Sequence, residues 1–168
     1  VDRPGLEAIR LGVEDLVIVT SSQHPLSAFS TVDLGELAHF PLLLPPRSNQ
    51  VLLHRVIEDA FVEVGRRARL GPAIASDHTA TLEVITNPRA WTVLYASTAA
   101  ETPHKGLRFM RDTRRLLRVP VCGVVRSGTT ATPELDFLMH ALARSIVPST
   151  DTIRASEADP SAQHSRST

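Results

Sequence analysis

The sequence predicts a protein of the α/β class, because β-strand patterns alternate with amphipathic helix patterns along the chain. Residues 14–20 form a short apolar run rich in β-branched side chains, which favours a buried strand over a helix. Residues 52–64 carry apolar side chains at helical spacing and are followed by Gly65, which predicts an amphipathic helix with a glycine end. This alternation predicts a parallel sheet with crossover helices.

Shorter elements are expected around these segments. Extended pieces are predicted at residues 40–44, 70–75, 91–95, 107–110 and 116–125. Thr132 is a candidate helix cap, followed by a proline suited to the first helical position and an acid that favours the helix dipole. Ser97 is the candidate cap of a helical turn. A further short helix has the capping candidates Ser76 and Asp77, the apolar residues Leu82, Val84 and Ile85, and Pro88 as its stop.

Composition excludes several classes of protein. Lys and Arg (18) balance Asp and Glu (18), so no net positive charge attracts nucleic acid and the chain alone is not expected to bind DNA. The single cysteine, Cys122, forms no internal disulfide, and its apolar neighbours predict a buried side chain in a reducing, cytoplasmic setting. No apolar run reaches the ~18 residues that predict a membrane span. Polar residues dominate positions 148–168, which predicts a disordered tail.

Motifs for catalysis, metals and nucleotides are missing from the sequence. The seven histidines show neither HxxxH nor HExxH spacing, so no metal site is expected. No GxSxG elbow supports a hydrolase, and no GxGxxG or GxxxxGK[ST] loop supports a nucleotide cofactor. We therefore expect no cofactor and no enzyme activity, with a hydrolase as the weaker alternative.

Polar residues follow several of the predicted strands. In open α/β sheets ligands bind beyond the carboxyl ends of the strands, and helix N-termini there offer N–H groups to anions. The candidate ligand-binding residues are Gln23, Arg47, Ser48, Asn49, Asn87, Arg89 and Trp91. Arg47 offers a fork of donors suited to a carboxylate, so a small organic acid is the expected ligand. The alternative is that these residues only make caps and turns, and that Trp91 lies in the core.

The order of the elements resembles the effector-binding domain of LysR-type transcriptional regulators over roughly residues 1–146. The matching segments are Glu14-Asp-Leu-Val-Ile-Val with His24-Pro25-Leu26, Val32-Asp-Leu-Gly-Glu-Leu37, Pro41-Leu-Leu-Leu-Pro-Pro46, the helix ending at Gly65, residues 82–97, and Thr132-Pro-Glu-Leu-Asp-Phe137. The resemblance implies a periplasmic-binding-protein-like (type 2) two-lobed fold with one lobe complete and one partial.

That resemblance also implies a division of the chain and a function. Residues 1–20 would be the end of lobe I and a first crossing strand, 21–98 lobe II, 99–147 the return crossing and the last part of lobe I, and 148–168 the tail. A small-molecule effector would bind between the lobes. The DNA-binding winged helix-turn-helix and the first half of lobe I have no counterpart in these residues. The resemblance further implies that the complete protein is a homodimer or homotetramer and that it does not bind membranes. A solute-binding protein of the same fold is the alternative, which an export signal upstream of Val1 would support.

Overall fold

The computed structural model describes residues 4–75, 81, 83–84, 86–103, 105–130 and 132–146. In chain order its elements are β1 (Leu6–Ser21), β2 (Thr31–Val32), α1 (Leu34–Leu37), α2 (Val51–Glu63), β3 (Trp91–Tyr95), α4 (Ala96–Glu101), β4 (Leu107–Asp112), β5 (Arg118–Arg126) and α5 (Pro133–Ser145). The predicted capping candidates Ser76 and Asp77, the helix positions Leu82 and Ile85, and the tail 148–168 lie outside the described residues. No helix within the described ranges is long and apolar enough to cross a membrane.

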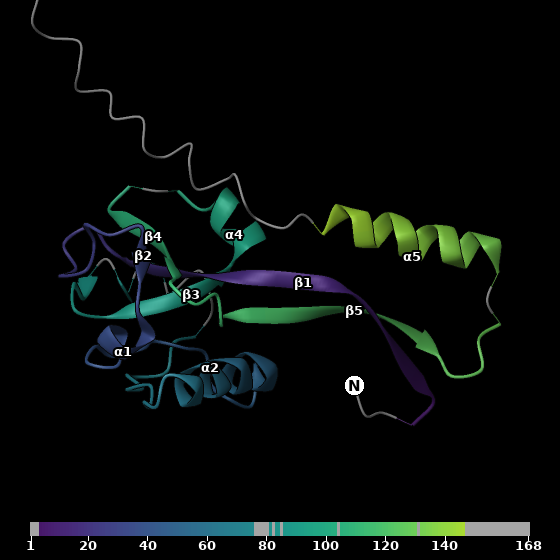
Figure 1. The fold of residues 1–168 in the computed structure, drawn as a ribbon, viewed down its shortest axis with the longest axis horizontal. Helices are drawn as coiled ribbons and strands as arrows, with labels where there is room; N and C mark the ends of the chain where they lie inside the picture. Colours follow the sequence, from purple (N-terminus) through teal and green to yellow (C-terminus); the bar gives the residue numbers. More distant parts are fainter. Residues whose placement is uncertain are drawn as a thin grey trace, which may run out of the picture.

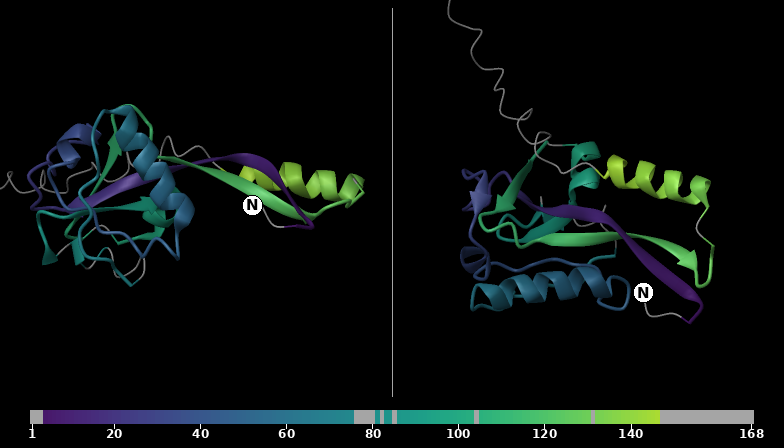
Figure 2. Two further views of the ribbon diagram at one scale, coloured as in Figure 1. Left: turned by 90° about the horizontal axis from the view of Figure 1, so that it is seen from below. Right: turned by 45° about the vertical axis from the view of Figure 1, so that its right-hand side comes forward.

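The molecule consists of a packed body and a projecting arm (Figure 1). We call residues 16–117 the body, and the arm consists of β1 up to Asp15, β5 and α5. Figure 2 shows in both views that the ribbon of β1 and β5 leaves the body and that α5 lies at its far part. β1 belongs to both regions, because its first part pairs with β5 and its last part with β3 and β4.

The sheet is mixed, and it differs in this respect from the parallel sheet that the sequence predicts. β1 pairs antiparallel with β3, β4 and β5, whereas β2 pairs parallel with β4. The predicted strand at residues 40–44 is reduced to single parallel bridges from Leu42 to Leu70 and to Trp91. An alternation of strands and helices predicts parallel pairing only for two strands that are joined directly by a crossover helix. Among the described elements, no crossover helix joins β1 to β3 or β4 directly, so the alternation does not fix the direction of β1 relative to them.

Both faces of the sheet are covered in the body, which explains the continuous apolar run in β1. Leu16 and Ile18 face one core cluster, which includes Phe61 of α2. Val17 and Val19 face a second cluster, which includes Ala96 of α4. The side chains of successive residues point to opposite faces of a strand, so a strand with no polar face must be buried on both sides.

The predicted helix at residues 52–64 is confirmed as α2. Its apolar stripe packs on the sheet through Leu53, Ile57 and Phe61, which are buried. Leu52 was predicted on the same stripe, but its side chain is 48% exposed. Gly65 follows the helix with a φ of +66°, a backbone conformation that glycine adopts without strain.

In the arm, α5 begins as predicted, because the Thr132 hydroxyl accepts a hydrogen bond from Leu135 N at 3.3 Å. The helix has no buried residue. It approaches the ribbon at Gly12 and Gly123, where an added Cβ would meet the side chains of Ile146 and Met139. Cys122 is exposed rather than buried, since only part of the ribbon is covered.

The chain returns to the arm well after residue 99, where the segment that the resemblance assigns to the return begins. α4 and β4 remain in the body, where Leu107 and Met110 are buried. β5 is the strand that leaves beside β1. At the junction, Asp112 accepts hydrogen bonds from Leu116 N and Leu117 N at 2.8 and 3.1 Å.

Candidate functional site

The predicted ligand-binding residues fall into separate groups at opposite ends of the body. Thr20 pairs with Trp91 and Leu16 with Tyr95, so the start of β3 lies at the end of the body far from the arm. The bridge from Leu42 to Trp91 is parallel, so the chain runs from there toward the arm and reaches residues 47–49 at the arm end. The candidate residues therefore do not share one end of the body, because β1 runs antiparallel to β3 and to residues 40–44.

The group at the outer end consists of Gln23, Asn87, Arg89 and Trp91. Trp91 is 0% exposed, and its indole N–H donates to the Phe40 carbonyl oxygen at 3.1 Å. Asn87 accepts a hydrogen bond from Arg89 N at 3.3 Å, and the Arg89 guanidinium lies 5.6 Å from the centre of the Phe40 ring. Gln23 N donates to the Ser21 hydroxyl. These contacts belong to turns and to the core, as the alternative interpretation of the sequence expected.

His24 is a buried polar residue beside this group, with 2% of its surface exposed. Its Nδ1 accepts a hydrogen bond from Leu26 N at 3.1 Å, which assigns the proton of the neutral ring to Nε2. Nε2 is buried and has no hydrogen-bond partner in the described part of the chain. Burial, and then the nearby positive charge of Arg89, lower the pKa of His24 below its ordinary value.

At the arm end, Arg47 forms a bidentate ion pair with Glu58 of α2. Nη1 donates to Oε1, and Nη2 donates to Oε2 at 3.1 Å. This hydrogen-bonded carboxylate raises the pKa of Arg47 above its ordinary value. Both side chains are about half exposed, at 56% and 48%. The guanidinium therefore lies along α2 rather than over its first turn.

The first turn of α2 follows shortly after residues 47–49 and lacks a side-chain cap from its N-cap residue, Gln50. A cap from Ser48 or Asn49 was the alternative to ligand binding, but the Ser48 hydroxyl donates to Asn49 Oδ1 at 3.2 Å instead. Asn49 N donates to the Pro46 carbonyl oxygen, and His54 Nε2 lies 2.8 Å from the Pro45 carbonyl oxygen. These bonds fix the turn against the helix. The first turn also has no acidic residue, so its positive dipole end has no negative side chain of its own.

Glu14 joins the arm to the body close to this end. Its Oε1 accepts hydrogen bonds from Ser97 N at 3.0 Å and from the Ser97 hydroxyl at 2.6 Å. The prediction that Ser97 caps a helix is wrong, because α4 begins after Tyr95 and includes Ser97. No sequence signal pointed to this contact, since the two residues are 83 positions apart.

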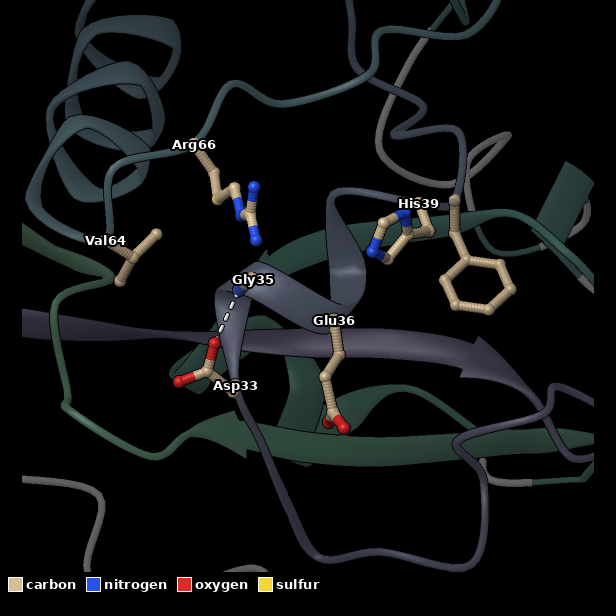
Figure 3. Close-up of a pocket in the computed structure, with 7 residues that line it drawn as sticks. Asp33, Gly35, Glu36, His39, Val64 and Arg66 are labelled. Atoms are coloured by element: carbon tan, nitrogen blue, oxygen red, sulfur yellow. Dashed lines mark hydrogen bonds between the residues drawn. The ribbon is translucent and has the colours of Figure 1, made fainter.

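A separate depression of about 590 Å³ lies between α1 and the end of α2 (Figure 3). It is lined by Asp33, Gly35, Glu36, His39, Phe40, Val64 and Arg66, none of which was a predicted site residue. Asp33 Oδ1 accepts a hydrogen bond from Gly35 N at 2.6 Å. Figure 3 shows the carboxylates of Asp33 and Glu36 directed away from the Arg66 guanidinium, so opposite charges do not converge on one ligand position. The described residues contain no group of metal-ligating side chains.

A sequence signal for α1 was present, because Asp33 and Glu36 have the spacing of a capping pair. The segment was expected only as part of a family pattern. The depression itself could not be predicted, since Val64 and Arg66 come from a distant part of the chain.

Known structures share this fold. CbnR, a LysR family transcriptional regulator, has 21% identity and a TM-score of 0.69, over 87% of this chain and 49% of that chain. The BenM effector binding domain with its effector benzoate has 17% identity and a TM-score of 0.70, over 87% of this chain and 65% of that chain. A mutant of Corynebacterium glutamicum OxyR has 21% identity and a TM-score of 0.69, over 92% and 47%. The chain thus spans about half the length of the CbnR and OxyR chains.

A search of curated proteins found no match. The sequence profile described as LysR substrate binding domain, in contrast, matches residues 1–146. The predicted fold class is confirmed as α/β and periplasmic-binding-protein-like (type 2), with one lobe partial. Since the profile covers most of the sequence, the chain belongs to the LysR substrate-binding domain family.

Proposed function

We propose that the chain is the effector-sensing part of a LysR-type transcriptional regulator and acts without catalysis in the cytoplasm. The observation that carries this proposal is the family match over residues 1–146. The body corresponds to lobe II, and the arm to the crossing strands with the last part of lobe I. Effector binding between the lobes modulates DNA binding by a winged helix-turn-helix outside this chain, in a homodimer or homotetramer.

The effector in this proposal is a small anionic metabolite. One structural neighbour is the effector binding domain of BenM with benzoate, which carries a carboxylate. In this chain the arm end of the body offers Arg47, the polar side chains of Ser48 and Asn49, and the first turn of α2 without an acidic residue. Arginine and a helix N-terminus both favour a carboxylate. Gln23, Asn87, Arg89 and Trp91 at the outer end are not part of this site.

Matched arginine variants test the assignment. Benzoate and a panel of small carboxylic acids are titrated into the chain by calorimetry, with Arg47→Ala and Arg89→Ala as the variants. Arg47→Ala removes a charge-assisted hydrogen bond to the ligand and should weaken binding roughly tenfold to a hundredfold. Arg89→Ala removes the same charge at the outer end and should leave the affinity unchanged. Equal affinities of the parent and Arg47→Ala, or a larger loss in Arg89→Ala, would contradict the proposed site.

A further inference from the structure

We propose that Glu58 is a built-in competitor of the effector, so that binding of a carboxylate exchanges the partner of Arg47 and breaks the Arg47–Glu58 pair. The inference rests on the proposed function, since it concerns the same site at the arm end. It adds a mechanism by which ligand binding changes the surface of α2.

The competition follows from the geometry of the pair. Both guanidinium Nη atoms of Arg47 donate to the two carboxylate oxygens of Glu58. This is the planar, bidentate arrangement with which arginine also binds a carboxylate ligand. These two Nη donors cannot bind both carboxylates at once, so Glu58 competes with the effector for Arg47.

Breaking the pair costs little. The side chains of Arg47 and Glu58 are 56% and 48% exposed, so water solvates both charges once they separate. Exposed ion pairs of this kind change an equilibrium by roughly 1.4-fold to fivefold. A ligand that also binds the first turn of α2 can therefore displace Glu58.

The alternative position of Arg47 lies at the beginning of α2. Glu58 lies seven positions after Val51, and a rise of about 1.5 Å per residue places them ~10 Å apart along the helix axis. The backbone of the turn is held by the bonds from Asn49 N to Pro46 and from His54 to Pro45. Only the Arg47 side chain needs to move to reach an anion over the first turn.

The exchange leaves an unpaired negative charge on the outer face of α2. Glu58 lies next to the Arg55–Asp59 pair, and the exposed apolar side chains of Val51, Leu52 and Val62 belong to the same helix. Effector binding at the end of the helix would thus alter the charge of a surface that faces away from the ligand. This couples the site to any contact that α2 makes in the complete protein.

Glu58→Gln and Asp59→Asn are a matched pair of variants for the test. Each removes one negative charge from α2, but only Glu58→Gln releases Arg47, because Asp59 pairs with Arg55. The probe is benzoate, titrated by calorimetry into the 168-residue chain, the two variants, Arg47→Ala, and Arg47→Ala combined with each of them. Nitrogen-15 NMR of the Arg47 side chain, without ligand, reports the ion pair independently.

We expect Glu58→Gln to bind benzoate about 1.4-fold to fivefold more tightly than Asp59→Asn, and this difference should vanish in the Arg47→Ala background. Saturating benzoate should change the Arg47 side-chain signals of the parent and bring them to the same positions as those of benzoate-bound Glu58→Gln, because Arg47 then has the same partner in both. If the parent binds benzoate but the two variants do not differ, the competition is wrong and the proposed function stands. If benzoate and the acid panel bind no variant, the anionic effector is wrong and the competition falls with it.

Discussion

The body and the arm share one strand, and β1 shows how differently the two regions are stabilised. In the body, Leu16, Val17, Ile18 and Val19 are at most 2% exposed because helices cover both faces of the sheet. In the arm, Leu6 and Ile9 of the same strand are 36% exposed, and among the described residues β5 is their only strand partner. A two-stranded ribbon is marginally stable alone. The comparison teaches that burial depends on what covers a strand rather than on its own apolar content.

The largest expected effect is the loss of Trp91 from the body core. Its side chain is 0% exposed and stacks near Phe61 with ring centres 6.1 Å apart. Trp91→Ala should lower the free energy of unfolding by about 3–5 kcal/mol, because truncation of a buried tryptophan leaves a cavity. Urea denaturation followed by circular dichroism measures the change.

Phe137→Ala in the arm is the control for this prediction. Its side chain is 70% exposed on α5, so truncation should change the free energy of unfolding by at most about 0.5 kcal/mol. A similar decrease in the free energy of unfolding in both variants would contradict the expected difference in side-chain burial between body and arm. It would mean that α5 is covered in solution.

A smaller, pH-dependent effect is expected from His24 in the body. Its folded-state pKa is lowered from an ordinary value of about 6.5, first by burial and then by Arg89. The unfolded chain therefore binds the proton more readily than the folded chain. Stability should be unaffected by this group above pH ~6.5, fall as the pH decreases below that value, and level off once folded His24 also protonates.

His24→Asn tests this dependence, since the Asn side-chain oxygen can accept from Leu26 N but does not titrate. Unfolding free energies of the parent and the variant are compared between pH 7.5 and 5. The parent should lose more stability over this range than the variant. Equal slopes would show that His24 takes up its proton equally in both states.

The sequence predicted local elements better than their directions. α2, β3 and the start of α5 follow from helix periodicity, from β-branched and aromatic residues, and from the Thr132 cap, all of which act within a few residues. The antiparallel pairing of β1 with β3 and β4 joins distant segments, and no local pattern encodes it. The candidate residues were identified one by one from their types, but their separation into opposite groups depends on this pairing.

Side-chain partners at the site were equally hidden from the sequence. Arg47 was predicted as an anion ligand because an arginine follows a strand and precedes a helix. Glu58 lies 11 positions further along the chain, on α2, and its carboxylate accepts from the Arg47 Nη donors that an anionic ligand would use. No local pattern around Arg47 indicates this partner. The exposed position of Cys122 likewise reflects the limited cover of the arm, which apolar neighbours in the sequence do not report.

Amide chemical-shift mapping of the uniformly nitrogen-15-labelled chain with benzoate tests the central claim most directly, because it locates the ligand without a mutation. We predict that the largest shifts occur at the arm end of the body, at Ser48, Asn49 and the first turn of α2, with a response of Glu58. Shifts centred on Asn87 and Arg89 at the outer end, or on Glu36, His39 and Arg66 around the depression of Figure 3, would contradict this assignment.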